Sequence, residues 1–381
     1  MPYKDLSSAR SLVARERDLA DLCEVLSARP AVAVDTESNS LYAYRERTCL
    51  IQLSIQGADY IVDPLAGLDL ASLGALFADP AVQKVFHAAE QDIAGMKRDF
   101  RFEFANLFDT MWAGRILGWP KLGLADLLEE HFGVRLAKRY QRYNWGGRPL
   151  APEALAYARM DTCYLLPLRD RQMEALERAG RLEEAGEIFA DLTRTPPAVV
   201  PYGAGAFWRV KDIHTVRGRA RAILWELYRW RDSVAKRRDR PPFKVLGDRT
   251  MVAVALAAPR TLEGLGGIKG ITPYLLRRYG RALLAAVRRG EGGAVPRPPR
   301  RRRLPQPVLG RYRALRAWRQ EAAGRRGVDA DVILSRDALW MLARQAPATV
   351  EDLEGIPCLG PWRRRTYGPE ILRVLHPTSQ D

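Results

Sequence analysis

The stretch Ala31-Val-Ala-Val-Asp-Thr-Glu37 decides the fold of the first half of this chain. Four small apolar residues predict a short buried strand, and two carboxylates follow at Asp35 and Glu37. Because side chains alternate along a strand, residues two apart share a face, so both carboxylates point the same way. Two such charges about 4 Å apart repel by roughly 4 kcal/mol at an effective dielectric near 20, which favours a bound cation. An ordinary strand that runs into a polar turn also fits this stretch.

The flanking sequence alternates between strand and helix patterns. Strands are predicted at 31–34, 49–55, 60–63 and 84–87, with a turn at 56–59, and helices at 10–28, 71–77, 88–97, 108–117, 124–132 and 153–166. Three strands close together in the chain predict a sheet whose first part is antiparallel. Strands that alternate with helices predict an α/β domain.

Two further acidic residues stand on the predicted helices. Asp92 lies one turn into its helix, and Asp161 lies four residues after Tyr157, so those two side chains share one helix face. With Asp35 and Glu37 they make a set of four carboxylates. Hard divalent ions prefer oxygen ligands, so a set without His or Cys fits Mg²⁺ or Mn²⁺ better than zinc.

Composition narrows the class of protein. The chain has 381 residues, of which 47% are hydrophobic, and this predicts two or three domains. No apolar run approaches the roughly 18 residues that span a bilayer, and the first residues lack the pattern of a secretion signal. The four cysteines are scattered without a C-x-x-C pair. We therefore expect reduced thiols and a cytoplasmic protein with no membrane partner.

Charge is divided unevenly along the chain. Residues 1–200 hold 24 Lys and Arg against 29 Asp and Glu, a net charge of −5, whereas residues 201–381 hold 37 against 16, a net charge of +21. A genome that favours Arg would raise the count in both halves, so it does not explain the asymmetry. A strongly basic half predicts a polyanionic partner, and nucleic acid is the usual one.

The basic half repeats itself. Trp230 matches Trp318, Pro259 matches Pro347 and Tyr279 matches Tyr367, and the numbers of each pair differ by 88. Each copy has the pattern of a long helix, a short helix, a glycine-containing turn and a final basic helix. Two copies of one helical module are therefore predicted, joined by a Pro/Arg-rich linker.

Several motifs resemble those of a known nuclease superfamily. Val34-Asp-Thr-Glu37, Lys84-Val-Phe-His-Ala-Ala-Glu-Gln-Asp92 and Tyr157-Ala-Arg-Met-Asp161 resemble the three exonuclease motifs of the DEDD superfamily, in its tyrosine-bearing branch. Asp109-Thr-Met-Trp-Ala-Gly-Arg-Ile-Leu-Gly-Trp119 and Trp145-Gly-Gly-Arg-Pro-Leu150 narrow the resemblance to ribonuclease D. All four acidic positions and the tyrosine are present.

The resemblance implies an RNase H-like exonuclease domain, with a mixed sheet and flanking helices. It also implies two divalent ions, Mg²⁺ or Mn²⁺, held by Asp35, Glu37, Asp92 and Asp161, and a water molecule that Tyr157 positions for attack. By analogy Asp35 bridges both ions, Glu37 and Asp161 complete one, and Asp92 supports the other. Two ions about 3.5–4 Å apart can stabilise both the attacking and the leaving oxygen of a phosphoryl displacement.

Five residues are candidate contacts to the substrate: Thr36, His87, Arg139, Arg142 and Tyr143. The loop that holds the last three mixes cations and aromatic rings, as surfaces that contact phosphates and stack on bases do. A structural role at the end of a strand fits His87 better than RNA contact. In the same loop, Trp145 fits a core position and Arg148 fits a helix cap.

The two modules resemble the HRDC domain, over about 210–290 and 307–376. The predicted division of the chain is an exonuclease domain at 1–200, a first HRDC-like domain at 206–290, a linker at 291–306 and a second HRDC-like domain at 307–381. The linker contains the run Arg300–Arg303, which could add phosphate contacts.

Two features of the modules favour RNA contact. The turns Gly270-Ile-Thr-Pro-Tyr274 and Leu359-Gly-Pro-Trp362 resemble helix–hairpin–helix turns, whose backbone N–H groups can meet phosphates. Arginines also recur at matched positions, Arg277 with Arg365 and Arg231 with Arg319. A charge run on a helix is often only a solvated face, and some HRDC domains bind protein instead.

The resulting prediction is a 3′→5′ exoribonuclease that removes nucleotides from RNA 3′ ends, such as those of tRNA precursors, and releases 5′-nucleotides, acting as a monomer. Two alternatives remain open. The same chemistry could act on DNA, because recognition of a 2′-hydroxyl need not leave a motif. A catalytically inactive RNA-binding scaffold is the other, and the intact acidic set speaks against it.

Overall fold

The computed structural model describes residues 12–136, 139–199, 203–298 and 304–377. The described residues fall into two compact units. The first is drawn from 1–37, 48–198 and 303–381, and the second from 38–47 and 199–302. The predicted run Arg300–Arg303 lies outside the described residues.

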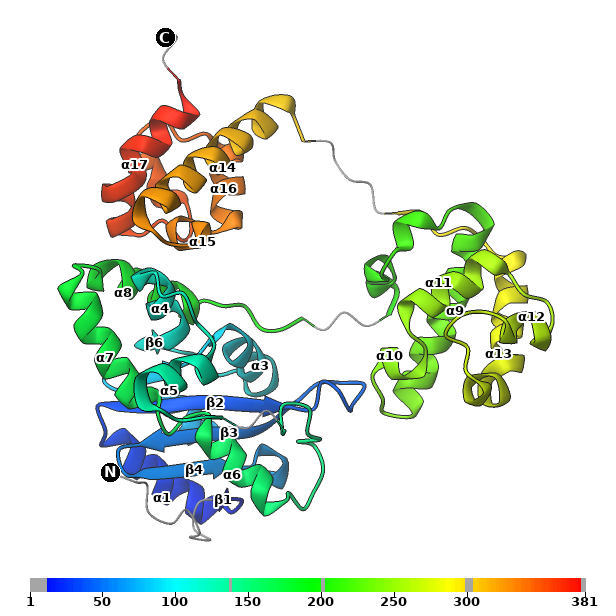
Figure 1. Ribbon diagram of the computed structural model, residues 1–381, viewed down its shortest axis with the longest axis horizontal. Helices are drawn as coiled ribbons and strands as arrows, with labels where there is room; N and C mark the ends of the chain where they lie inside the picture. Colours follow the sequence, from blue (N-terminus) through cyan, green and yellow to red (C-terminus); the bar gives the residue numbers. More distant parts are fainter. Residues whose placement is uncertain (1–11, 137–138, 200–202, 299–303, 378–381) are drawn as a thin grey trace. The chain divides into compact units, whose positions relative to one another are not determined.

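A six-stranded mixed sheet forms the centre of the first unit (Figure 1). Its strands are β1 (Leu12–Val13), β2 (Ala31–Ser38), β3 (Thr48–Ile55), β4 (Ala58–Val62), β5 (Gln83–Phe86) and β6 (Leu107–Asp109), in the order β1-β4-β3-β2-β5-β6. The β3–β4 hairpin is antiparallel, whereas β1 pairs with β4, β2 with β5 and β5 with β6 in parallel. The predicted mixed sheet is therefore confirmed.

Burial along β2 explains how this strand serves the site. Ala31–Val34 are buried in the main core, whereas Asp35–Ser38 are only partly buried. The strand is longer than the predicted 31–34, because its polar half continues to the edge of the domain. The neighbouring strand β3 is buried along its whole length, so it lies in the interior of the domain beside β2.

Eight helices cover the sheet in the described part of the nuclease half. They are α1 (Glu16–Ser27), α2 (Ala71–Ala78), α3 (Glu90–Phe100), α4 (Thr110–Leu117), α5 (Leu124–Phe132), α6 (Pro152–Met160), α7 (Leu165–Arg178) and α8 (Leu182–Thr193). Helices α1 and α2 pack together, α4, α7 and α8 pack with β5 and β6, and α6 lies against β3 and β4. A smaller apolar cluster that includes Trp145 and Ala158 lies under α6.

Three predicted helix boundaries are wrong. The helix predicted at 10–28 begins only at Glu16, because Leu12 and Val13 form β1 and pair with β4. The other two errors fall beside an acidic residue. The helix predicted at 108–117 begins only at Thr110, because Phe108 and Asp109 continue β6. The helix predicted at 153–166 ends at Met160, and a new helix begins at Leu165. Asp161 therefore caps the carboxyl end of α6 instead of lying in mid-helix.

The two helical modules have the same plan. In the first module the main helices are α9 (Gly218–Arg237), α10 (Pro242–Val245), α11 (Asp248–Ala257), α12 (Leu262–Gly266) and α13 (Pro273–Glu291). In the second they are α14 (Gln306–Arg326), α15 (Ala330–Ile333), α16 (Arg336–Gln345) and α17 (Pro361–Leu375). The helical carboxyl-terminal region of the prediction is confirmed.

Matched hydrogen bonds show that the duplication extends to side chains. Arg231 Nη1 donates to the Leu246 carbonyl at 3.0 Å, and Arg319 Nη1 donates to the Leu334 carbonyl at 2.8 Å. The donors and the acceptors both differ by 88 in number. The sequence pattern favoured RNA contact for this pair, but Arg231 is buried and also binds Asp248, so the pair closes each module internally.

In the described residues, all four cysteines are free thiols, and three of them are buried. None of the helices in the described chain combines the length and the apolar character that crossing a membrane requires. The cytoplasmic location and the monomeric state remain predictions.

Candidate active site

Strand β2 brings Asp35, Thr36 and Glu37 to one edge of the sheet. The Thr36 hydroxyl donates a short hydrogen bond to an Asp92 carboxylate oxygen on α3. The first and second acidic motifs, which are 56 residues apart, therefore meet at the end of β2. Thr36, a candidate substrate contact, lies within the acidic set.

Asp161 and Tyr157 enter the same region from α6. The negative charges of Asp92, Asp161 and Glu37 all raise the pKa of Asp35, after burial, which is the largest cause. Asp161 and Glu37 also raise the pKa of the Tyr157 hydroxyl, whose largest cause is again burial. The five predicted residues thus lie close enough to influence one another.

The charge balance of this cluster is unfavourable for ionised carboxylates. Burial, followed by the charges of Asp161 and Asp92, raises the pKa of Glu37 to about 9. Burial raises the pKa of Asp92 to about 7, although the Thr36 hydrogen bond lowers it, and burial raises the pKa of Asp161 to about 7. Perturbed carboxylates grouped in this way mark functional sites and are the setting that a bound cation stabilises.

Asp109 holds the second motif in place, a role that was not predicted from the sequence. Its fully buried carboxylate accepts hydrogen bonds from the N–H groups of Ala88 (3.2 Å), Ala89 (2.7 Å), Met111 (2.9 Å) and Trp112 (3.0 Å). Asp109 therefore caps α4 and fixes the start of α3, which carries Asp92. The available signal was an Asp directly before a helix, the usual N-cap residue.

A second buried contact fixes the segment that carries Asp161. The Ser54 hydroxyl on β3 lies 2.6 Å from the Thr162 hydroxyl and donates to Asp59 at 2.6 Å. Because Thr162 follows Asp161 directly, the hydrogen bond ties the end of α6 to the centre of the sheet. The sequence offered no signal for this contact, since Ser and Thr are common in strands and turns alike.

An aromatic cluster surrounds the ring of Tyr157. The Tyr140 and Trp145 rings lie with their centroids 5.6 Å and 6.3 Å from the Tyr157 ring, and the Trp145 ring is nearly parallel to it. Trp145 is buried, as predicted. Arg148 binds both carboxylate oxygens of Asp63 and the Cys49 and Trp145 carbonyls, so it clamps the loop to the sheet instead of capping a helix by itself.

The remaining candidate substrate contacts differ in their surroundings: His87 and Tyr143 make hydrogen bonds within the protein, whereas the two arginines are exposed. His87 Nδ1 lies 2.9 Å from the Thr110 hydroxyl, and burial lowers the pKa of His87 to about 4, which fits the structural role. The Tyr143 hydroxyl accepts a hydrogen bond from the Ala151 N–H at 3.3 Å. Arg139 and Arg142 are exposed on the loop, and Arg139 lies over the Tyr140 ring. Their contact with RNA stays a prediction.

The donor set fits a divalent cation by its chemistry: four carboxylates, no sulfur and no imidazole. Among the described residues, no three Asp, Glu, His or Cys side chains are already arranged as a complete ligand set for one ion.

Comparisons with known proteins agree with this geometry. Residues 11–177 match the model of a 3′-5′ exonuclease family, and residues 220–287 and 308–375 both match the HRDC domain. Fold and site together define a 3′→5′ exonuclease that carries two HRDC domains.

Relatives along the whole chain identify the family. Ribonuclease D of Acidiphilium cryptum is 33% identical over 95% of this chain and 92% of its own length. The crystal structure of Escherichia coli RNase D, described as an exoribonuclease involved in structured RNA processing, is 27% identical, with a TM-score of 0.66 over 97% of this chain and 99% of its own. The catalytic core of RRP6 from Trypanosoma brucei is 28% identical, with a TM-score of 0.64 over 76% of this chain and 82% of its own. This chain belongs to the ribonuclease D family of metal-dependent 3′→5′ exoribonucleases.

Proposed function

We propose that Asp35, Glu37, Asp92 and Asp161 bind two divalent ions, Mg²⁺ or Mn²⁺, and that Tyr157 positions the attacking water. The mutual electrostatic effect of these residues, which come from β2, α3 and α6, carries the proposal. Burial is the largest cause of their raised pKa values, and for Asp35, Glu37 and Tyr157 the negative charge of the neighbouring carboxylates adds to it. Cations at this position would restore the carboxylates to their ionised form.

When bound, two such ions stabilise the attacking and leaving oxygens of an in-line phosphoryl displacement and lower the pKa of a water molecule. The side chains of the protein itself orient the attacking water. Tyr157 keeps its proton, because the pKa of its hydroxyl is raised, and so it donates a hydrogen bond and does not act as a base. The Tyr140 and Trp145 rings hold the direction of that hydroxyl.

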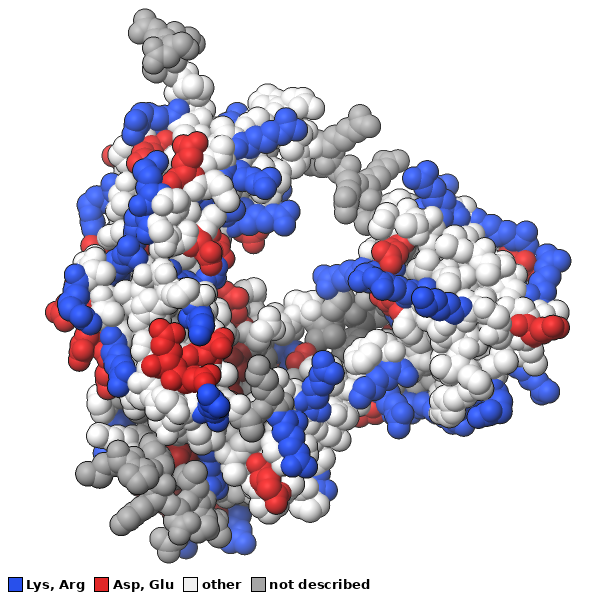
Figure 2. All heavy atoms as spheres, viewed as in Figure 1, with Lys and Arg blue, Asp and Glu red and all other residues white. Residues whose placement is uncertain are grey.

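We further propose that the substrates are structured RNAs with unpaired 3′ extensions, such as tRNA precursors, and that 5′-nucleotides are released. The description of the Escherichia coli relative as an enzyme of structured RNA processing supports this substrate class. The basic helical modules, over which Lys and Arg are spread in Figure 2, support contact with the body of a folded RNA.

The test is Asp35→Asn, which removes a charge but little volume. We expect the cleavage rate of a short single-stranded RNA with Mg²⁺ to fall by about 10⁴-fold, as when a central catalytic group is lost, with RNA binding retained. Glu90→Gln, an exposed change on α3, is the matched control and should leave the rate unchanged. Full activity of Asp35→Asn in purified, metal-stripped protein supplied with Mg²⁺ would refute the assignment.

The same phosphoryl chemistry can act on DNA, so the preference for RNA is tested directly. Degradation of RNA and DNA oligonucleotides of the same sequence separates the two activities. We expect faster removal of ribonucleotides. Equal rates would assign the enzyme to both nucleic acids.

A further inference from the structure

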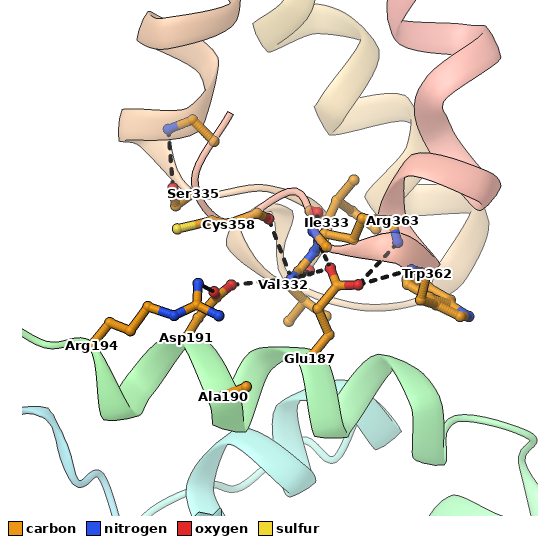
Figure 3. A network of polar contacts seen from close by, with 12 residues as sticks. Glu187, Ala190, Asp191, Arg194, Val332, Ile333, Ser335, Cys358, Trp362 and Arg363 are labelled. Carbon is orange, nitrogen blue, oxygen red and sulfur yellow. Dashed lines mark hydrogen bonds and ion pairs between the residues drawn. The ribbon is translucent and has the colours of Figure 1, made fainter. Parts of the chain in front are cut away.

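The second HRDC module is seated on the nuclease through the start of its last helix. Glu187 on α8 points at this helix start, with Arg363 beside it and Asp191 one turn further along α8 (Figure 3). The Glu187 carboxylate accepts hydrogen bonds from the N–H groups of Gly360 (3.0 Å), Trp362 (2.9 Å) and Arg363 (3.3 Å). Arg363 Nη1 also donates to Glu187 at 3.0 Å. A carboxylate of another domain thus caps α17.

Burial makes this contact difficult to break. The Arg363 and Glu187 side chains are 5% and 9% exposed. Arg363 also donates to the Val332 and Ile333 carbonyls of its own module, at 3.2 Å and 3.1 Å, and Val332 belongs to the main core of the nuclease. Removing one partner of such a pair leaves a buried charge without compensation, which is strongly destabilising.

Further contacts border the same interface. Arg326 binds the fully buried Glu184 at 2.6 Å, and Arg115 on α4 pairs with Asp329 and Asp331 of the second module. The interface therefore joins two helices of the nuclease to several segments of the module.

The first module shows what the second has changed. At the position 88 residues before Gly360 stands Thr272, whose hydroxyl accepts a hydrogen bond from the Leu275 N–H and caps α13 within the module. A Cβ on Gly360 would lie 2.3 Å from Glu187 Cδ, so only glycine leaves room for the foreign carboxylate. Arg363 likewise stands where the first module has Leu275. The duplicated helix starts differ at the two positions that the contact requires.

The exposed basic residues beside this helix start in the first module are mostly replaced by uncharged residues in the second. In the first module Lys269, Arg277, Arg278 and Arg281 are exposed around Tyr274, which is 55% exposed. The matched positions in the second module are Pro357, Arg365, Thr366, Pro369 and Trp362. Of these only Arg365 is charged, and it binds both carboxylate oxygens of Glu183 on α8 at 2.7 Å.

We propose that the duplicated modules have divided their work. The start of α17 in the second module binds the nuclease, with Glu187 at the place where a phosphate would bind. The second module is therefore a fixed part of the catalytic unit. The exposed basic face of the first, with Tyr274 as a stacking ring, contacts the RNA backbone. That the polyanion is RNA rests on the proposed function, whereas the seating of the second module does not.

A matched pair of double variants tests the division in the full chain, with Asp35→Asn present to prevent cleavage. Arg277→Gln with Arg278→Gln, and Arg364→Gln with Arg365→Gln, each remove two charges from the first turns of the equivalent helix. Affinity for a single-stranded RNA is measured from 50 to 300 mM salt. We expect the first pair to make the negative slope of log K against log[salt] shallower by about 1.4 and the second pair to leave it unchanged. Equal changes in both would overturn the proposal.

Hydrogen exchange tests the seat separately. In Glu187→Gln we expect the Trp362 and Arg363 N–H groups to exchange on the order of 100-fold faster or more, because the buried charge of Arg363 loses its partner. Glu177→Gln, an exposed change on α7, is the control and should change little. Gly360→Ala should act like Glu187→Gln. Unchanged exchange in both Glu187→Gln and Gly360→Ala would overturn the seat, whatever the nuclease assay shows.

Discussion

At the residue scale, the site depends on how a few side chains share charge. Asp35, Glu37, Asp92 and Asp161 are spread over 127 positions (35 to 161) in the chain, yet burial raises the pKa of each, and the charges of the other acids raise it further for Asp35 and Glu37. A protein that only needed stability would have no reason to gather them. The cluster is therefore the part of the molecule where function overrides stability.

Tyr157→Phe tests the role of the hydroxyl alone. Its aromatic neighbours keep their packing, so we expect the stability to change little, while the rate of RNA cleavage falls on the order of 100-fold. Single-turnover rates with excess enzyme give the chemical step directly. A rate near that of the parent protein would show that the water is positioned by other groups.

The raised pKa values also predict how stability responds to pH. The pKa of Glu37 is about 9 in the folded chain against 4.5 as the ordinary value, so the folded state binds more protons than the unfolded state between these values. The free energy of unfolding should therefore fall as the pH rises from 7 to 9 in a chelator. Thermal unfolding should show a smaller decrease for Glu37→Gln, and with saturating Mg²⁺, because bound cations replace protons. A decrease identical in the parent protein and Glu37→Gln would contradict the assigned pKa.

At the scale of the elements, one buried carboxylate positions two helices. Asp109→Asn replaces one acceptor oxygen with an amide group that cannot accept a hydrogen bond. We expect the free energy of unfolding to fall by about 1–3 kcal/mol, because backbone N–H groups near Ala88 and Met111 lose their partner. Denaturant titration measures it, and Asp79→Asn at an exposed turn is the control. Cleavage should fall as well, since Asp92 lies on the helix that becomes loose.

The elements were predictable where a regular pattern was long. The α5 bounds and the β3–β4 hairpin follow from periodicity and from a Gly-containing turn, and the four acids with Tyr157 follow from the motifs. Errors arose where burial overrides propensity. The short strand β6 lies in a parallel position against β5, and nothing in its three residues distinguishes it from the helix that follows.

Contacts between distant segments could not be predicted from the sequence. The turn at Leu359–Trp362 was expected to meet phosphates, and its N–H groups instead meet Glu187. A single Glu on an amphipathic helix has no local feature that marks its partner 173 residues away. The repeat of Arg231 and Arg319 predicts RNA contact, whereas both arginines bind carbonyls inside their own modules, and a sequence does not show which Arg is buried.

At the scale of the whole molecule, the two compact units should unfold as two cooperative parts. The second module shares the core of the nuclease through Val332, whereas the first module has a core of its own. We expect hydrogen exchange under increasing denaturant to open α17 together with α8, and α9 with α11 at a different concentration. If α17 instead opens together with α9, the two units are assigned incorrectly.

Glu187, Gly360 and Arg363 form one contact although they lie in different domains. In a related protein without the glutamate, the helix start would no longer require glycine and the arginine would lack its ion-pair partner. The three residues should therefore be present or absent together. Their joint presence in a related sequence would then indicate a second module that is fixed to the nuclease, and their absence would indicate a second module that moves independently.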